Sequence, residues 1–156
     1  MKYRCYEAPL KDKRQTSEEI KRLVNVYHGD LNKIDIMHGG RKVCLADLSL
    51  GDFYDFVRRL PYRKDTKPVE IVGRPKYILE NHANGMDCKK KAVLMASFLK
   101  LKKIPFRFVG ASSRPDGAIH HIYPEAHFNG EWIHTDATYS HYRIGQRKSE
   151  TAREIL

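Results

Sequence analysis

The sequence predicts an α+β protein in which N-terminal helices and one central buried helix, with Cys88 at its N-terminus, pack on a small antiparallel sheet. Apolar residues recur at helical spacing before residue 62 and again after Cys88, whereas short runs after residue 104 alternate in polarity as strands do. The dipeptide Asn129-Gly130, placed between two alternating runs, is a strong signal for a two-residue hairpin. Together these patterns favour helices first and antiparallel strands afterwards.

The length of 156 residues is that of one ordinary domain. We expect a single domain over residues 1–156. It divides into an N-terminal arm over residues 1–16, a helical part over 17–61, a core over 62–142 and a polar tail over 143–156. The tail is expected to close the chain as a short helix.

Composition limits the possible locations and partners. No apolar stretch reaches the roughly 20 residues of a membrane span, and the charged first residues lack the apolar segment of a signal peptide, so we expect a cytoplasmic protein. The net charge of +10 is shared by both halves of the chain, which makes nucleic acid an unexpected partner. We interpret the lysine runs 89–91 and 100–103 as solvated surface.

Three cysteines without a CxxC motif indicate reduced thiols rather than disulfides or a zinc ribbon. Cys5 and Cys44 are expected to be small buried hydrophobes. Cys88 differs because it follows Asp87, a good N-cap residue, and precedes an apolar run from Ala92 to Leu99. Its thiol should therefore lie on the first turn of a core helix, where the helix dipole favours thiolate, and Cys88 is a candidate nucleophile.

Start and stop signals define the helices before Cys88. Thr16 or Ser17 is expected to cap a helix that stops at Gly29, and Ser49 to cap another that ends before Pro61.

Other connections are also predicted. Gly39-Gly40 suits the turn of a hairpin. The charged stretch from Tyr62 to Pro75 is expected to be an irregular surface connection, with a short helix beginning at Pro75 and broken at Asn84-Gly85.

The Asn129-Gly130 turn also sets a register for the two strands that it joins. If those two residues form the loop, Tyr123 faces Asp136 and His121 faces Thr138, so His121 and Asp136 become diagonal neighbours roughly 7–8 Å apart. Side chains alternate, and one face then carries His121, Tyr123, Glu125, His127, Trp132, His134, Asp136 and Thr138. If this face packs on the Cys88 helix, a Cys-His-Asp triad forms.

Other interpretations of these residues remain open. His120 points to the opposite face and is expected to be structural or to flank the site. His121, His127, His134 and Asp136 on one face could also hold a metal, but cross-strand histidines are ordinary in sheets, and we expect no metal and no cofactor. Glu125 and His134 suit a local ion pair, and Tyr62 and Tyr123 are candidates to line the cleft.

The order of motifs resembles the transglutaminase-like superfamily of papain-related cysteine enzymes. It reads Asp-Cys on a core helix, Ile-Pro-x-Arg before a strand, His-x-Tyr-x-Glu, and Gly-x-Trp-x-x-x-Asp-x-Thr, and it spans about Tyr62 to Thr138. The resemblance implies a papain/transglutaminase-like core in which Cys88 is the nucleophile, His121 the general base and then acid, and Asp136 its orienting partner.

The chain departs from this pattern in three places. Lysines follow Cys88 where many relatives have an acid, Ala137 replaces a common proline, and no tryptophan precedes the cysteine to serve the oxyanion. The backbone N–H of Cys88 is then one expected oxyanion donor.

We therefore predict a cysteine protease or amidase that acts on a protein or peptide through a thioester. The alternative is a structural or interaction module that keeps the fold within a larger assembly, such as a phage particle, where the location would be the virion and the partner another protein of the assembly.

Overall fold

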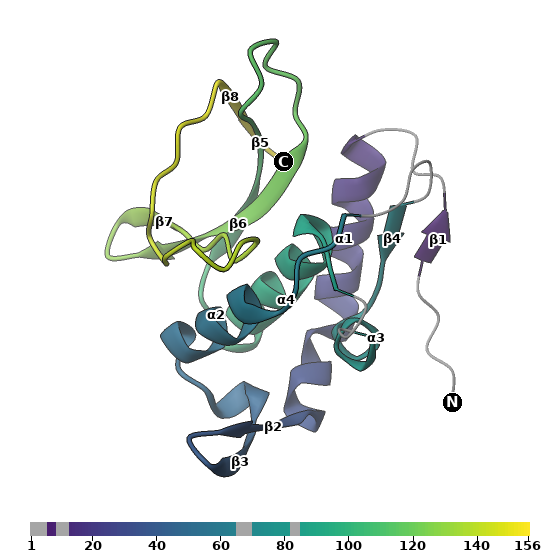
Figure 1. Cartoon of the computed structure of the whole chain (residues 1–156), viewed down its shortest axis with the longest axis vertical. Helices are drawn as coiled ribbons and strands as arrows, with labels where there is room; N and C mark the ends of the chain where they lie inside the picture. The colour runs from purple at the N-terminus through teal and green to yellow at the C-terminus, as the bar shows by residue number, and fades with distance from the viewer. Residues whose placement is uncertain (1–5, 9–12, 65–69, 82–84) are drawn as a thin grey trace.

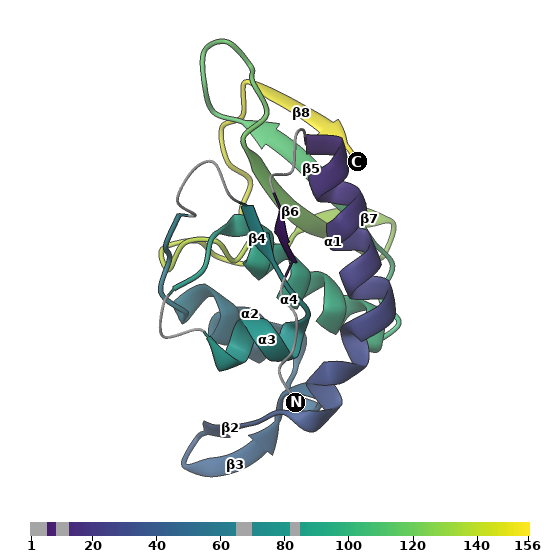
Figure 2. The same ribbon diagram turned by 90° about the vertical axis from the view of Figure 1, so that its right-hand side faces the viewer.

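The computed structural model describes residues 6–8, 13–64, 70–81 and 85–156, and it confirms the α+β class (Figures 1 and 2). The helices are α1 (Lys13–Tyr27), α2 (Leu50–Arg59), α3 (Pro75–Glu80) and α4 (Cys88–Leu101), with 3-10 turns at His28–Lys33 and Leu45–Asp47. The strands are β1 (Tyr6–Ala8), β2 (Asp35–His38), β3 (Arg41–Cys44), β4 (Glu70–Val72), β5 (Phe106–Ser112), β6 (His121–Phe128), β7 (Glu131–His134) and β8 (Ala152–Ile155).

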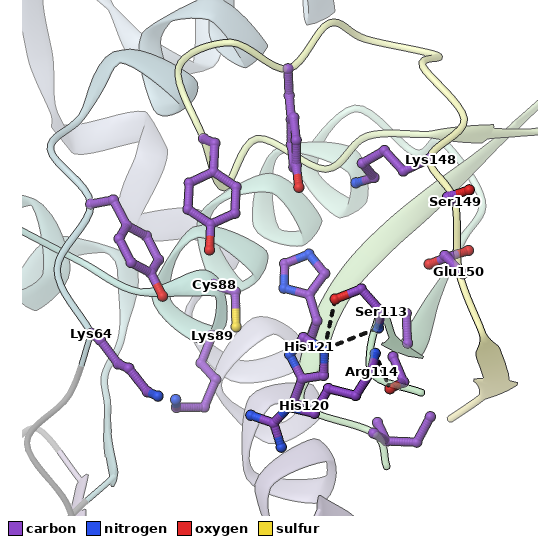
Figure 3. Close-up of a pocket in the computed structure, with 16 residues that line it drawn as sticks. Lys64, Cys88, Lys89, Ser113, Arg114, His120, His121, Lys148, Ser149 and Glu150 are labelled. Atoms are coloured by element: carbon purple, nitrogen blue, oxygen red, sulfur yellow. Dashed lines mark hydrogen bonds between the residues drawn. The ribbon is translucent and has the colours of Figure 1, made fainter. Parts of the chain in front are cut away.

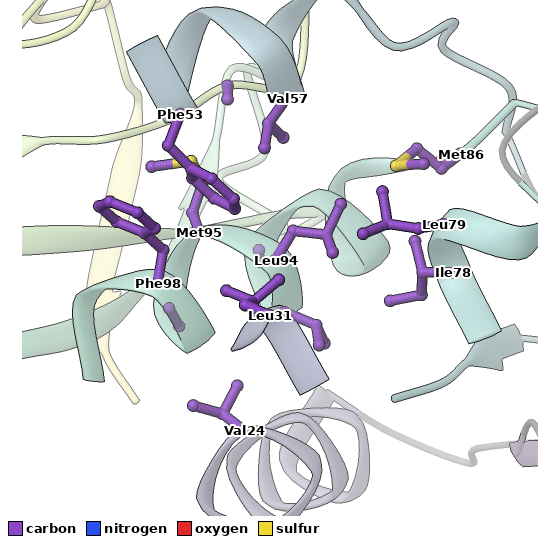
Figure 4. Packing of buried hydrophobic residues seen from close by; sticks show 14 of the residues in the cluster. Val24, Leu31, Phe53, Val57, Ile78, Leu79, Met86, Leu94, Met95 and Phe98 are labelled. Carbon is purple, nitrogen blue, oxygen red and sulfur yellow. The ribbon is translucent and has the colours of Figure 1, made fainter. Parts of the chain in front are cut away.

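Helix α4 is the centre of the hydrophobic core, as its sequence predicted. Asp87 caps it by accepting a hydrogen bond from the Lys90 backbone N–H at 3.2 Å, and every residue from Lys91 to Leu99 is buried. Side chains from the other helices surround it (Figure 4). Phe53 of α2 stacks on Phe98 of α4 with ring centroids 4.3 Å apart, so α2 and α4 are held face to face.

The main sheet is antiparallel and has the strand order β7-β6-β5-β8. The predicted hairpin register is confirmed from Glu125 opposite His134 to Phe128 opposite Glu131. Asn129 and Gly130 have φ angles of 49° and 81°. Both central residues therefore adopt the left-handed conformation that a tight hairpin turn of the I′ type requires.

The predicted pairing stops short of Asp136. Thr135 still donates its backbone N–H to the Pro124 carbonyl at 3.1 Å, but Pro124 has no N–H to return. The ladder ends there, and the expected facing pairs Tyr123 with Asp136 and His121 with Thr138 do not form. Asp136 instead lies in the loop that follows β7.

The sheet face that packs on the helices is not the one we expected. Phe108 and Ile122 join the helical core, whereas Val109 and Tyr123 form a separate cluster on the other face. The face that carries His121 and Tyr123 therefore points away from the core. The reason is polarity, because the apolar α4 buries more apolar surface against Phe108 and Ile122 than against histidines and Glu125.

The C-terminal tail is a strand rather than the predicted helix. Strand β8 pairs with β5 from Val109 opposite Ile155 to Ser112 opposite Ala152. An unpaired β5 edge would leave its backbone groups exposed, and β8 covers them. The tail therefore belongs to the sheet, and the segment before it, residues 140–151, crosses the polar face.

Most predicted boundaries near the N-terminus hold, with two differences. Helix α1 begins at Lys13, and the Ser17 hydroxyl donates to the Arg14 carbonyl at 3.0 Å instead of capping the helix. Strands β1 and β4 pair with each other, so the expected arm and the expected irregular connection each contain a short strand.

Other signals are confirmed. The Ser49 hydroxyl accepts from the Asp52 N–H at 3.1 Å and caps α2. Strands β2 and β3 form the hairpin around Gly39-Gly40, and Pro75 begins α3. The expectations for Cys5 and for the helix break at Asn84 lie outside the described residues.

The chain approaches α4 through a close contact with the segment after α2. The Met86 N–H donates to the Pro61 carbonyl at 2.9 Å, and the Arg63 N–H donates to the Met86 carbonyl at 3.1 Å. Gly85, with φ of 77°, makes this possible, since a Cβ there would lie 2.6 Å from Arg63 Cβ. Tyr62 is therefore held beside the start of α4.

Among the described helices, none combines the length and apolar character of a membrane span.

Replacement of Phe98 by Ala should lower the free energy of unfolding by about 3–5 kcal/mol, because Phe98 is fully buried and stacked on Phe53. Urea unfolding measures the change. Val26→Ala is the matched control, since Val26 is 57% exposed and should change stability by less than about 0.5 kcal/mol. Equal effects of the two substitutions would contradict the central position of α4.

Candidate active site

A cleft of about 560 Å³ opens at the N-terminal end of α4 (Figure 3). Four segments line it: Tyr62 and Lys64 after α2, Cys88 and Lys89 of α4, part of the β5–β6 connection between 111 and 121, and part of the segment from Tyr139 to Glu150. The cleft thus gathers residues that are far apart in the sequence. Its volume lies within the range of small-molecule binding sites.

Cys88 is the first residue of α4, and its thiol is half-buried and lies at the cleft. Asp87 positions it, because the Asp87 side chain caps the helix and also accepts a charged hydrogen bond from Lys89. Figure 3 shows that the Cys88 sulfur points into the cleft, toward the His121 ring. The predicted location of Cys88 on the first helical turn is therefore what the structure shows.

His121 is the first residue of β6, and its ring is bonded to Asp136 and lies at the same cleft as Cys88. Its Nε2 lies 2.6 Å from Asp136 Oδ2. Since Nε2 is bonded to the carboxylate, Nδ1 is the nitrogen that can face the thiol. Burial of the ring lowers its pKa, but hydrogen bonds to Asp136 and to Cys88 outweigh burial and raise the pKa to about 10.

The Asp136 carboxylate is almost fully buried, and both of its oxygens accept hydrogen bonds. Its Oδ1 accepts from the Thr138 hydroxyl at 2.6 Å and from the Thr138 N–H at 3.1 Å. The hydroxyl of Tyr54 donates to its backbone carbonyl at 2.7 Å. Burial raises the carboxyl pKa, but the hydrogen bond and charge of His121 and the charge of Lys148 hold it well below the ordinary range. Asp136 is thus ionised at neutral pH.

Lys148 is a site residue that the sequence analysis missed. Its ammonium forms a hydrogen-bonded ion pair with Asp136 Oδ2, the oxygen that also bonds His121. It also lies over the rings of Tyr123 and Tyr142, at 4.6 Å and 4.1 Å from their centroids. Lys148 lies in the segment we assigned to a polar tail, and no local pattern distinguishes it there. Only the pairing of β8 with β5 brings that segment across the sheet.

Lys91 corrects our interpretation of the lysine run after Cys88 as solvated surface. It is 1% exposed, and its ammonium donates to the carbonyls of Leu60 and Thr138, both at 2.8 Å. Burial lowers its pKa to about 8, although the charge of Asp136 opposes that shift. Lys91 therefore ties the end of α2 to the loop that holds Asp136. Its position one turn after Cys88, on the buried side of α4, was the available signal.

The remaining predicted residues take different places. Tyr62 lines the cleft and packs against Tyr139 with ring centroids 4.8 Å apart. His120 also lines it, and its Nε2 accepts from the Ser113 N–H at 3.1 Å. Tyr123 does not line the cleft, because it is buried beneath Lys148 and donates its hydroxyl to Glu150 at 2.9 Å.

Glu125 contacts His134 as predicted, with Nε2 3.0 Å from Oε2, but burial lowers the pKa of His134, so a neutral imidazole rather than a cation makes this contact at neutral pH. Arg107 and Arg153 also contact this carboxylate, at 3.0 Å and 2.9 Å, so it is part of a buried charge cluster. In the described part of the chain, no three His, Cys, Asp or Glu side chains are grouped as a metal site would need.

Comparison with known proteins gives a family match at the same segment. The sequence model of the transglutaminase-like superfamily matches residues 50–137, which include Cys88, His121 and Asp136. A crystal structure of a proposed cysteine protease from Cytophaga hutchinsonii is similar at a TM-score of 0.43 and 15% identity over 91% of this chain. The chain spans half the length of that protein. No curated protein matches significantly.

The raised pKa of His121 predicts a pH-dependent stability. Unfolding returns the ring to its ordinary pKa of 6.5, so the stabilising contribution is complete below pH 6.5 and is lost as the pH rises toward about 10. Between pH 6.5 and 7.5 the loss is about 1 kcal/mol, because the unfolded ring is still partly protonated at the start of this interval. Urea unfolding should show this slope in the parent protein and a flatter profile in His121→Gln. Parallel profiles would contradict the assignment.

Lys148→Met should cost about 2–3 kcal/mol of stability at pH 6, because it leaves the buried Asp136 charge with one cation fewer. Lys148→Arg, which keeps the charge, should restore most of the loss. As the pH falls through the lowered pKa of Asp136, a neutral carboxyl no longer needs the cation, so the difference between the parent and Lys148→Met should shrink. An equal loss in both variants would indicate packing rather than charge.

Proposed function

Because this chain belongs to the transglutaminase-like superfamily, we propose that it is a cysteine hydrolase, a protease or amidase, with Cys88 as nucleophile. The observation that supports this most strongly is the position of His121. Its ring is bonded through Nε2 to the buried Asp136, and the Cys88 sulfur lies toward the ring at the wall of the same open cleft (Figure 3). That arrangement suits general-base activation of a thiol.

The first half of the reaction forms a thioester. His121 takes the proton of the Cys88 thiol, and a ring pKa of about 10 favours the imidazolium that results. The thiolate attacks an amide carbonyl, and the carbonyl electron pair moves to oxygen. When the tetrahedral intermediate collapses, the C–N bond breaks and the imidazolium gives its proton to the departing amine.

The second half regenerates the enzyme. His121, now neutral, accepts a proton from water as the water attacks the thioester carbonyl, and the C–S bond breaks to release a carboxylic acid. Asp136 remains ionised throughout and stabilises the imidazolium in each half. We infer water as the acceptor because the described residues show no recognisable site for a second amine.

We propose two donors that stabilise the oxyanion. The Cys88 backbone N–H is at the first position of α4, where no helical carbonyl can accept it, and the helix dipole adds positive potential. The Tyr62 hydroxyl is the second donor that we propose, since the contact of its segment with Met86 fixes it beside the cleft. We propose that the Tyr62 hydroxyl stabilises the oxyanion in place of an upstream tryptophan, since no tryptophan precedes Cys88 in the sequence.

The alternative, an assembly module without catalysis, does not need an open cleft over the thiol or a charged histidine beside it. The cleft of about 560 Å³ and the buried Asp136 therefore favour the enzyme. We propose a protein or peptide as the substrate, because the cleft is open and holds both polar groups and tyrosines.

Alkylation by iodoacetamide at pH 7 tests the proposed nucleophile. Cys88 should react at least tenfold faster than Cys44, because the Cys88 thiol lies at an open cleft beside the His121 ring whereas the Cys44 thiol donates to the Leu31 carbonyl. Mass spectrometry of the two cysteine peptides measures each rate. His121→Ala should slow Cys88 by about tenfold or more.

Cys44→Ala is the matched control, since it removes a half-buried thiol away from the cleft and should leave the fast phase unchanged. Cys88→Ala should abolish that phase. Equal rates at Cys44 and Cys88, or a fast phase that survives in Cys88→Ala, would contradict the proposed function.

A further inference from the structure

One flank of the cleft is lined with cations from three separate segments. Figure 3 shows the ammonium groups of Lys64 and Lys89 and the guanidinium of Arg114 together on one side of the Cys88 sulfur. Lys64 follows α2, Lys89 is the second residue of α4, and Arg114 belongs to the β5–β6 connection. The fold therefore assembles positive charge beside the thiol.

Of the four lysine and arginine side chains that line the cleft, two form ion pairs with aspartates in the described part of the chain and two do not. Lys89 pairs with Asp87, and Lys148 pairs with Asp136. Within residues 6–8, 13–64, 70–81 and 85–156, no ion pair is formed by Lys64 or Arg114. The carboxylate that lines the cleft, Glu150, is bonded to the Tyr123 hydroxyl instead.

The backbone holds Arg114 in place. Its N–H donates to the Ser112 hydroxyl at 3.1 Å, and its carbonyl accepts from the Gly117 N–H at 3.0 Å and from the Thr151 hydroxyl. The β8 side of the sheet thus fixes the turn that carries the guanidinium. A ligand that binds Arg114 would not need to order this loop, which reduces the cost of binding.

Lys64 is anchored in a similar way. The preceding Arg63 N–H is bonded to Met86, so the segment lies along the approach to Cys88. The positive charges also act on a neighbour in the cleft. Burial, together with the charges of Arg114 and Lys64, lowers the pKa of His120.

We propose that this cleft selects acidic peptide segments, with Lys64 and Arg114 binding a carboxylate close to the carbonyl that Cys88 attacks. This inference rests on the proposed function and names its substrate class. A guanidinium pairs well with the two oxygens of a carboxylate, and a flexible ammonium adds a second charge. Nucleic acid is less suitable, because these two cations line one cleft, whereas binding a phosphate backbone draws on cations along its length.

Peptide chloromethyl ketones that differ only in one charge test the proposal. Each alkylates a thiol irreversibly, and paired reagents carry Glu or Gln at the first, second or third residue from the ketone. At 50 mM salt we expect at least one Glu reagent to modify Cys88 about tenfold faster than its Gln partner. Each of the two unpaired cations is expected to raise the rate roughly threefold, and the two factors multiply. The ratio should fall at 500 mM salt.

Two variants test whether Lys64 and Arg114 cause the preference for the Glu reagent. In Lys64→Gln/Arg114→Gln the ratio of Glu to Gln rates should fall close to one, and this ratio is the readout because a change in the intrinsic reactivity of Cys88 affects both reagents equally. Arg41→Gln is the matched control, because it removes an exposed cation on the β2–β3 hairpin, which lines no part of the cleft. The ratio should be unchanged in this variant. Iodoacetate, compared with iodoacetamide, measures the same charge preference without a peptide.

The outcomes separate this proposal from the proposed function. Fast iodoacetamide labelling of Cys88 with a Glu-to-Gln ratio near one at every position would overturn the acidic substrate and leave the nucleophile intact. A ratio that survives in the double variant would show that net charge, not Lys64 and Arg114, attracts the reagent. Slow labelling of Cys88 by every reagent would overturn both proposals.

Discussion

A buried negative charge at Asp136 is the constraint on which the site depends. A carboxylate that is 3% exposed is stable only if cations and hydrogen-bond donors surround it. The structure supplies His121, Lys148 and Thr138 for this purpose. The imidazolium that the proposed reaction requires is therefore also the group that makes burial of Asp136 possible, and folding and site chemistry are coupled through one ion pair.

Lys91 extends this coupling into the core. Its ammonium is bonded to the Thr138 carbonyl, and Thr138 in turn donates to Asp136, while the Leu60 carbonyl ties the same ammonium to the end of α2. Helix α4 thus positions both the thiol at its first residue and, through a buried lysine one turn later, the loop of its acidic partner. A shift of α4 would move both ends of the site together.

The C-terminal segment has a similar double role. By pairing with β5, strand β8 closes an exposed sheet edge, and it also holds the segment that carries Lys148 and Glu150 over the polar face. This explains how a sheet can present His121 on the side away from the helical core and still bring it to Cys88. His121 is the first residue of β6 and lines the same cleft as the first turn of α4, so the site lies at the rim of the sheet.

Local signals in the sequence determined the caps of α2 and α4 and the β6–β7 register from Glu125 to Glu131, because each depends on a few neighbouring residues or on a two-residue period. They also singled out Cys88, His121 and Asp136 as candidate site residues. The tertiary structure alone decided three other features: which sheet face is covered, where the β6–β7 ladder ends, and what partners the tail and the lysines have. Pairing of β8 with β5, burial of Lys91 and the ion pair of Lys148 join residues distant in the chain. Such contacts leave no periodic signal, since they arise only when the packed core requires an edge to be covered or a charge to be neutralised.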